Sequence, residues 1–216
     1  MHVVIFAGGT VQAGSAVDAA LARANLVIAA DRGAVTALQY GHTPSIVVGD
    51  FDSLPLPRSE LEARGCRLIA APVEKNETDT ELAVQVAIEQ GASEITLLGA
   101  IGGARFDHTI ANILLLAGID SVPLHIVDGP VTCWLLRGPG STTIPGHVHD
   151  LLSLFPLTVD ATGIHTAGLY YPLDSETLYF GRPRGISNVL TQEQAEVSLE
   201  HGLLLVVHTN IQELHE

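Results

Sequence analysis

Positively charged residues are scarce in this chain. Its 216 residues include 24 Asp and Glu but only 10 Lys and Arg, which gives a formal net charge of −14, and Lys75 is the only lysine. Binding to nucleic acid through counterion release needs a basic surface, and binding to an anionic membrane needs a cluster of Lys and Arg. The composition therefore excludes both kinds of partner. If the substrate carries phosphate, backbone N–H groups, a few arginines and a bound metal have to hold it.

Long apolar runs and cysteines are also few. No apolar run reaches the 18 residues of a membrane span, and the first run, residues 3–7, has no basic region before it, so we interpret it as a strand and not as a signal peptide. Cys66 and Cys133 are too few for a disulfide framework, and we expect buried thiols. A chain with 47% hydrophobic residues is not disordered. We therefore predict a folded, cytoplasmic protein.

Up to about residue 128, apolar runs alternate with helical patterns. The runs are apolar throughout, which is typical of strands buried on both faces of a sheet. The expected strands are residues 3–7, 26–30, 45–48, 67–71, 94–100 and 123–127, and the expected helices are 15–24, 33–40, 59–64, 80–90 and 108–117. This alternation predicts a three-layer α/β domain over residues 1–130, with a mainly parallel sheet and helices on both faces.

After Pro130 the helical periods disappear. Short β-prone runs are separated by Gly, Pro and Asp turns, at residues 132–136, 151–156, 169–171, 177–180, 196–199 and 203–209. This spacing predicts a small antiparallel sandwich or barrel, and we adopt the β-sandwich, over residues 131–216. The fold class is therefore α/β plus all-β.

Acidic residues follow successive strands of the expected parallel sheet. Asp31, the pair Asp50 and Asp52, Asp79 and Asp107 come after four consecutive strands. In an open parallel sheet, ligands bind at the carboxyl ends of the strands. We therefore expect these acids to meet at one edge of the sheet and to form a site there.

Asp50 and Asp52 are the first candidates for a metal site. They lie two residues apart in what we expect to be an extended exit from a strand, so both carboxylates face the same way. Side by side they repel each other unless a cation lies between them. Mg²⁺ typically binds one or two carboxylates together with substrate phosphates. We interpret the pair as metal ligands; the alternative is that Asp52 only shapes a turn.

The residues just before the helix expected at 80–90 have two interpretations. Thr78 with Glu81 fits a capping box, and Asp79 is then a first-turn acid favoured by the helix dipole. Capping does not explain Lys75, which can reach a phosphate held at the helix N-terminus. We therefore include Asp79 among the metal ligands, and Lys75 and Thr78 among the residues that bind the nucleotide.

The loop before the last expected helix combines glycines with charged residues. Gly102 and Gly103 let the backbone approach a ligand closely. Arg105 is a fork-shaped donor suited to phosphate oxygens. Asp107 is either a helix cap or a residue of the site, and His108 lies beside it. We predict that this loop binds phosphate.

Two further features of the sequence give weaker indications of ligand binding. Asp31 precedes a helix and is either its cap or a ligand contact. Residues 8–10, Gly-Gly-Thr, do not form a GxGxxG fingerprint, and no GxxxxGK[ST] loop occurs in the chain. No common nucleotide motif therefore identifies the ligand.

Six sequence blocks together resemble the thiamine pyrophosphokinase (thiamine diphosphokinase) family. They are ADRGA (30–34), VVGDFDSL (47–54), EKNETDTELAV (74–84), GAIGGARFDHTIANILLL (99–116), GISN (185–188) and HGLLLVV (201–207). The resemblance covers nearly the whole chain, and the order of GDFDS, TDxE and GxRxDHxxxN makes it specific. It implies a homodimer whose active sites lie between the α/β domain of one subunit and the sandwich of the other. It also implies Mg²⁺-dependent transfer of pyrophosphate from ATP to thiamine, giving thiamine diphosphate and AMP.

The resemblance assigns roles by position. The residues that match family motifs in the α/β half are Asp50, Asp52, Asp79, Arg105, Asp107 and Asn112, the first three being metal-associated. Ser187 and Asn188 match a Ser-Asn pair associated with thiamine, although by themselves they are typical of an ordinary turn. For this reaction we expect Arg105 to hold a phosphate oxygen, and Asp107 either to orient or deprotonate the thiamine hydroxyl or to act as a metal ligand.

The chain departs from the family in two places. Asn76 stands where the family usually has Asp, so metal binding is expected to be weaker if that Asp is a ligand. Residues 203–205 are leucines where some relatives have a Trp that stacks on thiamine, and the only Trp here is Trp134. An aromatic residue elsewhere in the chain then stacks on thiamine, or aliphatic side chains contact thiamine in place of the Trp.

Three alternatives stay open from the sequence. They are a phosphatase with Asp50 as nucleophile, a pyrophosphokinase acting on another alcohol such as a pterin, and a non-catalytic sensor of nucleotide or thiamine. Release of AMP from ATP only when thiamine is present distinguishes all three from the favoured activity.

Overall fold

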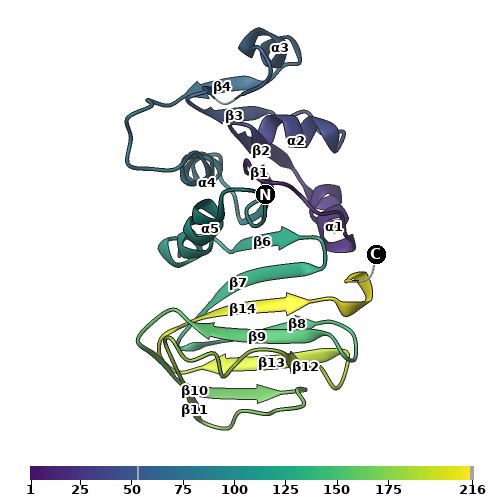
Figure 1. The fold of residues 1–216 in the computed structure, drawn as a ribbon, viewed down its shortest axis with the longest axis vertical. Coiled ribbons are helices and arrows are strands. Elements are labelled where there is room, and N and C mark those ends of the chain that lie inside the picture. The colour runs from purple at the N-terminus through teal and green to yellow at the C-terminus, as the bar shows by residue number, and fades with distance from the viewer. Residues whose placement is uncertain (53, 215–216) are drawn as a thin grey trace. The chain divides into compact units, whose positions relative to one another are not determined.

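The computed structural model describes residues 1–52 and 54–214 of the chain. The chain divides into two compact units, the N-terminal unit Met1–Gly129 and the C-terminal unit Pro130–Glu216 (Figure 1). The predicted fold class is confirmed, because the first unit is an α/β domain and the second is a β-sandwich. No helix within the described ranges is long and apolar enough to cross a membrane.

The N-terminal unit is built on a sheet of six parallel strands. Their order across the sheet is β6-β5-β1-β2-β3-β4, so β1 lies in the middle between β2 and β5. The strands are β1 (His2–Phe6), β2 (Leu26–Ala30), β3 (Ile46–Gly49), β4 (Arg67–Ala70), β5 (Glu94–Leu98) and β6 (Leu124–Asp128). All six were expected from the apolar runs, within two residues at each end.

Helices cover both faces of this sheet, which makes the unit three layers thick. In Figure 1, α4 and α5 lie on one face, whereas α1 and α2 lie on the other. The helices are α1 (Ser15–Arg23), α2 (Gly33–Gln39), α3 (Arg58–Ala63), α4 (Asp79–Glu89) and α5 (Phe106–Gly118). The central strand is buried along its whole length, because side chains on both of its faces pack against helices. The edge strand β4 is not buried, which corrects the expectation of burial for all six strands.

The C-terminal unit contains two antiparallel sheets. One has the order β12-β9-β14-β7 and the other the order β11-β10-β13-β8. The strands are β7 (Val131–Arg137), β8 (Gly140–Pro145), β9 (Leu151–Pro156), β10 (Asp160–Ala167), β11 (Glu176–Tyr179), β12 (Asn188–Val189), β13 (Gln194–Leu199) and β14 (Leu203–Thr209). Buried and more exposed residues alternate along β9 and β13, as in a sandwich with one inner face per sheet.

Side chains from both sheets meet in one apolar core. It includes Leu152 and Leu154 of β9, Ile164 of β10 and Val206 of β14. The expected strand at residues 169–171 is wrong: Leu169 makes a single bridge and the segment forms no strand. Cys66 and Cys133 are buried thiols, as predicted.

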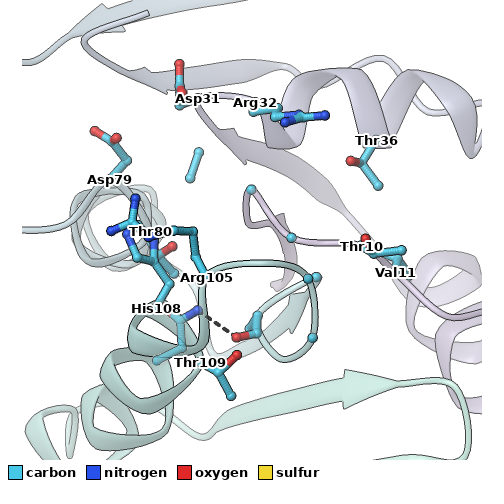
Figure 2. Close-up of a pocket in the computed structure, with 18 of the residues that line it drawn as sticks. Thr10, Val11, Asp31, Arg32, Thr36, Asp79, Thr80, Arg105, His108 and Thr109 are labelled. Carbon is cyan, nitrogen blue, oxygen red and sulfur yellow. Dashed lines mark hydrogen bonds between the residues drawn. The ribbon is translucent and has the colours of Figure 1, made fainter. Parts of the chain in front are cut away.

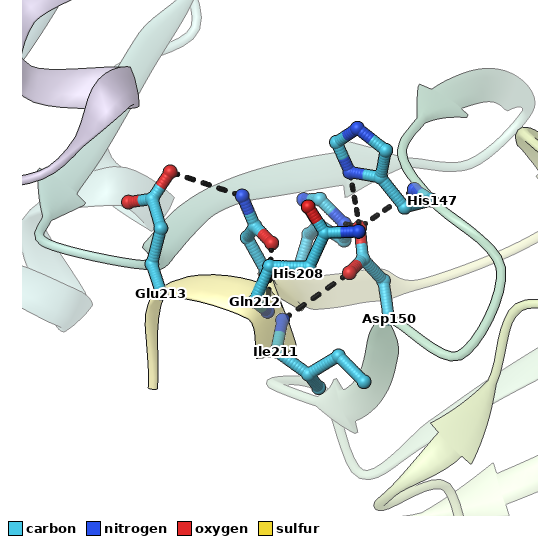
Figure 3. Close-up of polar contacts among 7 residues, drawn as sticks. His147, Asp150, His208, Ile211, Gln212 and Glu213 are labelled. Carbon is cyan, nitrogen blue, oxygen red and sulfur yellow. Dashed lines mark hydrogen bonds and ion pairs between the residues drawn. The ribbon is translucent and has the colours of Figure 1, made fainter. Parts of the chain in front are cut away.

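A buried acid ties three segments of the C-terminal unit together. Asp150 is 0% exposed, and its carboxylate accepts hydrogen bonds from the N–H groups of His147 (2.8 Å) and Ile211 (3.2 Å). Nε2 of His208 on β14 lies 2.9 Å from the same carboxylate (Figure 3). Asp150 thus joins the turn before β9, strand β14 and the short 3₁₀ helix η1 (Ile211–Glu213).

Candidate functional site

A pocket of about 870 Å³ opens at the carboxyl ends of the parallel strands. It is centred on β1 and β5, neighbours from which the chain leaves toward opposite faces of the sheet, and such a switch point is where open α/β sheets bind ligands. Figure 2 shows Asp31, Asp79 and Arg105 around this hollow. The predicted residues that line it are Asp31, Asp52, Thr78, Asp79, Gly102, Gly103, Arg105, His108 and Asn112. Three other predicted residues of this unit, Asp50, Lys75 and Asp107, lie outside the lining.

The loops after β1 and β5 meet backbone to backbone. The N–H of Gly9 donates to the carbonyl oxygen of Gly99 at 3.0 Å, and a Cβ added to Gly9 would lie 2.4 Å from that oxygen. Only glycine permits this approach. The Gly-Gly-Thr stretch at residues 8–10, which gave only a weak nucleotide signal in the sequence, therefore lines the pocket beside the β5 loop.

Helix α2 adds residues that the sequence analysis missed. Arg32, Thr36, Gln39 and Tyr40 line the pocket from this side. With Arg105, Arg32 gives the lining two guanidinium groups. The available signal was the rarity of cations in this chain, together with the position of Arg32 directly after the predicted Asp31.

Asp31 lies at the end of β2 in a backbone conformation that is unusual for aspartate. Its φ is +43°, and its N–H donates to the carbonyl oxygen of Val48 on the neighbouring strand at 2.8 Å. The residue is buried and lines the pocket. Asn and Asp tolerate this left-handed region better than most residues, and such conformations are concentrated at functional sites.

The chain does not leave β3 in the expected extended conformation at Asp50 and Asp52. Phe51 between them has φ +63°, so the chain turns, and the N–H of Asp52 donates to Oδ1 of Asp50 at 3.1 Å. Asp52 lines the pocket, whereas Asp50 is directed toward Lys75. The N–H of Asp52, helped by the charge of Lys75, holds the pKa of Asp50 below its usual value.

Lys75 is directed toward two of the predicted metal ligands. Its Nζ lies 2.9 Å from Oδ1 of Asp79 and 3.9 Å from Oδ2 of Asp50. Burial lowers the pKa of Lys75, but the contact with Asp79 and the charges of Asp79, Asp50 and Asp31 outweigh it and raise that pKa above its usual value. Thr78 caps α4 as predicted, because its Oγ1 accepts the N–H of Glu81 at 3.1 Å.

No three Asp, Glu, His or Cys side chains in the described ranges come together as a group able to hold a metal ion. Two carboxylates, those of Asp50 and Asp79, do converge on one cation, the Lys75 ammonium. Mg²⁺ needs only one or two carboxylates when phosphate oxygens complete its coordination. The residues present therefore fit a magnesium ion that arrives with a phosphate ligand.

The loop between β5 and α5 is held by Asn112. The buried Nδ2 of Asn112 donates to the carbonyl oxygen of Ala100 at 2.7 Å, which fixes the start of the loop that carries Gly102 and Gly103. Arg105 follows in the same loop and lines the pocket with His108. Asn112 therefore supports the loop through its side chain.

Arg105 and Asp107 form a two-point ion pair. Nε of Arg105 lies 3.0 Å from Oδ1 and Nη2 lies 2.7 Å from Oδ2 of Asp107. Through these bonds Arg105 lowers the pKa of Asp107 to about 2. A general base works best with a pKa near the working pH, so this geometry gives no support to Asp107 as a base. Its contact instead orients the guanidinium of Arg105.

Ser187 and Asn188 lie in the C-terminal unit. Ser187 has φ +55°, and its N–H donates to Oγ of Ser153 at 3.0 Å. The side-chain amide of Asn188 holds the backbone of Tyr171: Nδ2 donates to its carbonyl oxygen at 2.7 Å and Oδ1 accepts its N–H at 3.0 Å. Oδ1 also accepts the N–H of Val189 at 2.9 Å, so most of the hydrogen-bonding capacity of Asn188 is used within the protein.

Two family models match the chain, one in each unit. The model described as "Thiamin pyrophosphokinase, catalytic domain" matches residues 17–127, and the one described as "Thiamin pyrophosphokinase, vitamin B1 binding domain" matches residues 141–204. Among curated proteins, the thiamine pyrophosphokinase of Bacillus subtilis (strain 168) is 30% identical over 188 residues, which cover 85% of this chain and 87% of that protein.

Solved structures agree with the sequence matches. The crystal structure of thiamine pyrophosphokinase from Bacillus subtilis has a TM-score of 0.82 at 26% identity and covers 98% of this chain and 100% of its own. That of thiamin pyrophosphokinase from Geobacillus thermodenitrificans has a TM-score of 0.81 at 28% identity and covers 97% of this chain and 98% of its own. Since both units match in sequence and in fold over nearly their whole length, the chain belongs to the thiamin pyrophosphokinase family.

Proposed function

We propose that this protein transfers pyrophosphate from ATP to the hydroxyl of thiamine in a Mg²⁺-dependent reaction, giving thiamine diphosphate and AMP. The observation that carries the proposal is the pocket at the β1/β5 switch point, most of whose lining residues lie in the segment that matches the family's catalytic domain. Its volume of about 870 Å³ is large enough for a nucleotide. Its lining offers glycine backbone and arginine, which suit phosphate.

The phosphates of ATP would be held with little help from lysine. Gly8, Thr10, Gly102 and Gly103 bring backbone N–H groups to the pocket lining, and Arg32 and Arg105 contribute fork-shaped donors. The N-terminus of α4, with its positive dipole end, opens onto the same space at Thr78 and Thr80. These groups together can hold phosphate even though the chain has few cationic side chains.

We assign Mg²⁺ binding to Asp50, Asp52 and Asp79. Support comes from the convergence of Asp50 and Asp79 on the Lys75 ammonium and from the position of Asp52 in the pocket lining. A magnesium ion bound there supplies charge neutralisation for the phosphate oxygens. The loss of one carboxylate at Asn76 remains a reason to expect weak binding before nucleotide is added.

In this reaction the main role of the protein is to position the reacting groups. The hydroxyl oxygen of thiamine forms a bond to the β-phosphorus and releases its proton to solvent, the bond from that phosphorus to the α–β bridging oxygen breaks, and AMP leaves with the electron pair. Arg105, oriented by Asp107, donates to an oxygen of the transferred group. Arg32 and the glycine loops hold the rest of the triphosphate.

Thiamine would bind with the help of the C-terminal unit, around Ser187 and Asn188. Support comes from the match of residues 141–204 to the family's vitamin-B1-binding domain. Aliphatic contact from residues 203–205 is not favoured, because Leu204 and Leu205 are buried in β14. Tyr170 and Tyr171 beside Asn188 are exposed and are better placed to contact a flat cationic ring.

The proposal also includes a cytoplasmic homodimer. Two buried thiols suit a reducing compartment. Phe106, Ile110 and Leu114 form an exposed apolar line along α5, and a second copy of the chain is the occupant that we propose for it. The same dimer would bring the α/β unit of one subunit to the sandwich of the other.

One assay tests donor, acceptor and reaction type together. Purified protein is incubated with ATP, Mg²⁺ and either thiamine, a hydroxymethylpterin or no acceptor, and the products are separated. We expect AMP only with thiamine. AMP formed with the pterin alone would identify another acceptor, inorganic phosphate formed without AMP would indicate a phosphatase, and binding without turnover would indicate a sensor.

Substitution of Asp52 tests the acidic site. Asp52→Asn keeps the size of the side chain and removes its charge from the pocket, so we expect kcat to fall by at least about a hundredfold with an unchanged unfolding midpoint. Asp120→Asn, which changes an exposed acid of the same unit, serves as the matched control. Near-normal turnover of Asp52→Asn at saturating Mg²⁺ would contradict the assignment.

A further inference from the structure

The only lysine of the chain is enclosed by acids. The side chain of Lys75 is 12% exposed, and its ammonium lies 2.9 Å from Asp79 and 3.9 Å from Asp50. The charge of Asp31 also acts on it. Carboxylates this close in a partly buried place repel one another unless a cation lies among them. Lys75 therefore supplies the positive charge that this acidic cluster needs.

The same position is the one at which a divalent cation would bind. Carboxylate oxygens of Asp50 and Asp79 converge there, and they are ligands that Mg²⁺ accepts. An ammonium and a metal ion cannot both lie against the same two carboxylates, because the two cations repel each other. One of them has to leave when the other binds.

A lysine side chain can readily move away from the two carboxylates. Its ammonium is a compact charge on a flexible four-carbon stem, unlike the rigid fork of arginine. Residues 71–78 form neither helix nor strand, so no regular backbone holds the side chain in place. The segment ends at Thr78, which caps α4 at the edge of the pocket. A short movement would bring the ammonium from the carboxylates toward a phosphate bound in that pocket.

We propose that Lys75 is a placeholder for the divalent cation: it neutralises Asp50 and Asp79 in the free protein, is displaced when the metal binds, and then turns to the phosphates of the nucleotide. This inference rests on the proposed function and adds a sequence of events to it: the metal binds first, and Lys75 then contacts the nucleotide. The exchange makes metal binding and nucleotide binding favour each other, because the metal releases the cation that the nucleotide uses. Lys75 is thus a positioning residue whose partner changes during loading.

The first test measures metal affinity without nucleotide. Mn²⁺, used as a paramagnetic probe, is titrated into wild type and into Lys75→Met, and free Mn²⁺ is followed by electron paramagnetic resonance. Removal of the competing ammonium is expected to tighten Mn²⁺ binding about tenfold. Arg64→Met is the control, because it removes one positive charge from an exposed pair with Glu60, away from these carboxylates. Equal or weaker binding by Lys75→Met would overturn the proposal.

The second test uses unmodified wild-type protein, so it does not depend on how a variant folds. Because Lys75 is the only lysine, trace acetylation followed by mass spectrometry reports on one ε-amino group, and the α-amino group of Met1 serves as the reference. Mn²⁺ alone is expected to increase the acetylation rate of Lys75 several-fold, and Mn²⁺ with a non-hydrolysable ATP analogue to lower it again. A rate that does not change with the metal would overturn the exchange.

These outcomes are separate from those of the activity assay. If thiamine gives no AMP while Lys75→Met binds Mn²⁺ more tightly, the proposed substrate is wrong and the exchange stands. If thiamine gives AMP while both metal tests show no effect, the exchange is wrong and the proposed function stands.

Discussion

The hydrogen bonds of Asn188 lie within the protein. The resemblance suggests a thiamine contact, yet its amide bonds the backbone of Tyr171 in both directions. These two hydrogen bonds fix the backbone beside two exposed aromatic rings, Tyr170 and Tyr171. The ring centroids lie 4.8 Å apart in an edge-on arrangement. We therefore expect Asn188 to act by positioning and Tyr171 to act by contact.

Tyr171→Ala tests this division at the residue scale. A tyrosine ring attracts a cationic ring with about 1 kcal/mol at an exposed site, so its removal should raise the KM for thiamine about fivefold with little change in the KM for ATP. Tyr171→Phe should keep most of the affinity, because the ring face remains. Tyr179→Ala, which removes another exposed tyrosine of the same unit, is the control. An unchanged KM for thiamine in Tyr171→Ala would contradict the contact.

The sequence identified residue types better than residue pairs. Nine of the predicted residues line one pocket, but the residue pattern did not indicate that Asp107 would pair with Arg105 or that Lys75 would lie between Asp50 and Asp79. Ion pairing depends on the backbone conformation of a loop and on the rotamers that bring opposite charges together. A residue pattern specifies neither, even for pairs as close in the chain as Arg105–Asp107 and Lys75–Asp79. Phe51 is the clearest example, because its positive φ turns a chain that was expected to leave β3 in an extended conformation.

At the scale of elements, the contact between the β1 and β5 loops shapes the pocket. Gly9→Ala would place a methyl group 2.4 Å from the carbonyl oxygen of Gly99, so the two loops have to separate. We expect a loss of about 1–3 kcal/mol in unfolding free energy and weaker ATP binding. Urea denaturation and calorimetric titration with ATP measure the two effects.

Gly118→Ala is the matched control for this substitution. Gly118 ends α5, and a Cβ there would have no neighbour within 4 Å, so the change should be neutral or stabilise by up to about 1 kcal/mol. A Gly9→Ala variant as stable as Gly118→Ala, with normal ATP binding, would show that the loops can move apart freely.

Asp150 has the corresponding role among elements of the C-terminal unit (Figure 3). Burial by itself raises the pKa of this carboxyl, but the N–H groups of His147 and Ile211 and the ring of His208 outweigh it and hold the pKa below its usual value. Asp150→Ala leaves these donors without an acceptor, so we expect the unfolding free energy at pH 7 to fall by roughly 1–3 kcal/mol.

The pH dependence of this loss has a definite sign. An acid whose pKa is lowered by folding stabilises the protein above its unfolded pKa, near 3.8, and this contribution disappears as the pH falls through the folded pKa. Urea denaturation should therefore show the largest difference between wild type and Asp150→Ala at neutral pH and a shrinking difference below pH 3.8. Asp160→Ala, an exposed acid of the same unit, should show neither effect. A difference that grows toward acid pH would contradict the bonding scheme.

Strands could be predicted from the sequence where their residues are apolar throughout. The inner parallel strands β1 and β5 are continuous apolar runs because helices cover both faces, and all six parallel strands were found, including the more exposed edge strand β4. β8, β10 and β12 were missed, because these strands include polar residues and glycine, and β12 has only two residues. Their assignment depends on pairing with partners that are distant in the chain, which a local pattern does not report.

At the scale of the whole molecule, the exposed line on α5 predicts the assembly. Phe106, Ile110 and Leu114 are 72%, 44% and 56% exposed and are spaced four residues apart, so they share one face of the helix. Leu114→Glu should convert a dimer into a monomer, as measured by light scattering after gel filtration. Val159→Glu changes another exposed apolar residue and is the control. A wild type that is monomeric at all concentrations would contradict the homodimer.

Mixing experiments test whether subunits share active sites. Asp52→Asn alters the N-terminal unit and Asn188→Ala the C-terminal unit, so a mixed dimer would contain one site with both defects and one with neither. Unfolded and refolded together, the two variants should recover activity that neither has alone. No recovery from a mixture that forms mixed dimers would place each site within one chain.

The sequence by itself determined the two-part fold class, the family and the acids and glycines that gather at one end of the parallel sheet. It did so because apolar runs, turn residues and motif order are local properties. Only the tertiary structure decided which acid faces which cation, that residues 8–10 and Arg32 line the pocket, and that Asn188 holds Tyr171. The pocket lining and the contact of Asn188 with Tyr171 bring together segments that are separated in the chain. Pairs within one loop, such as Arg105 with Asp107, depend on a loop conformation that no local residue pattern specifies.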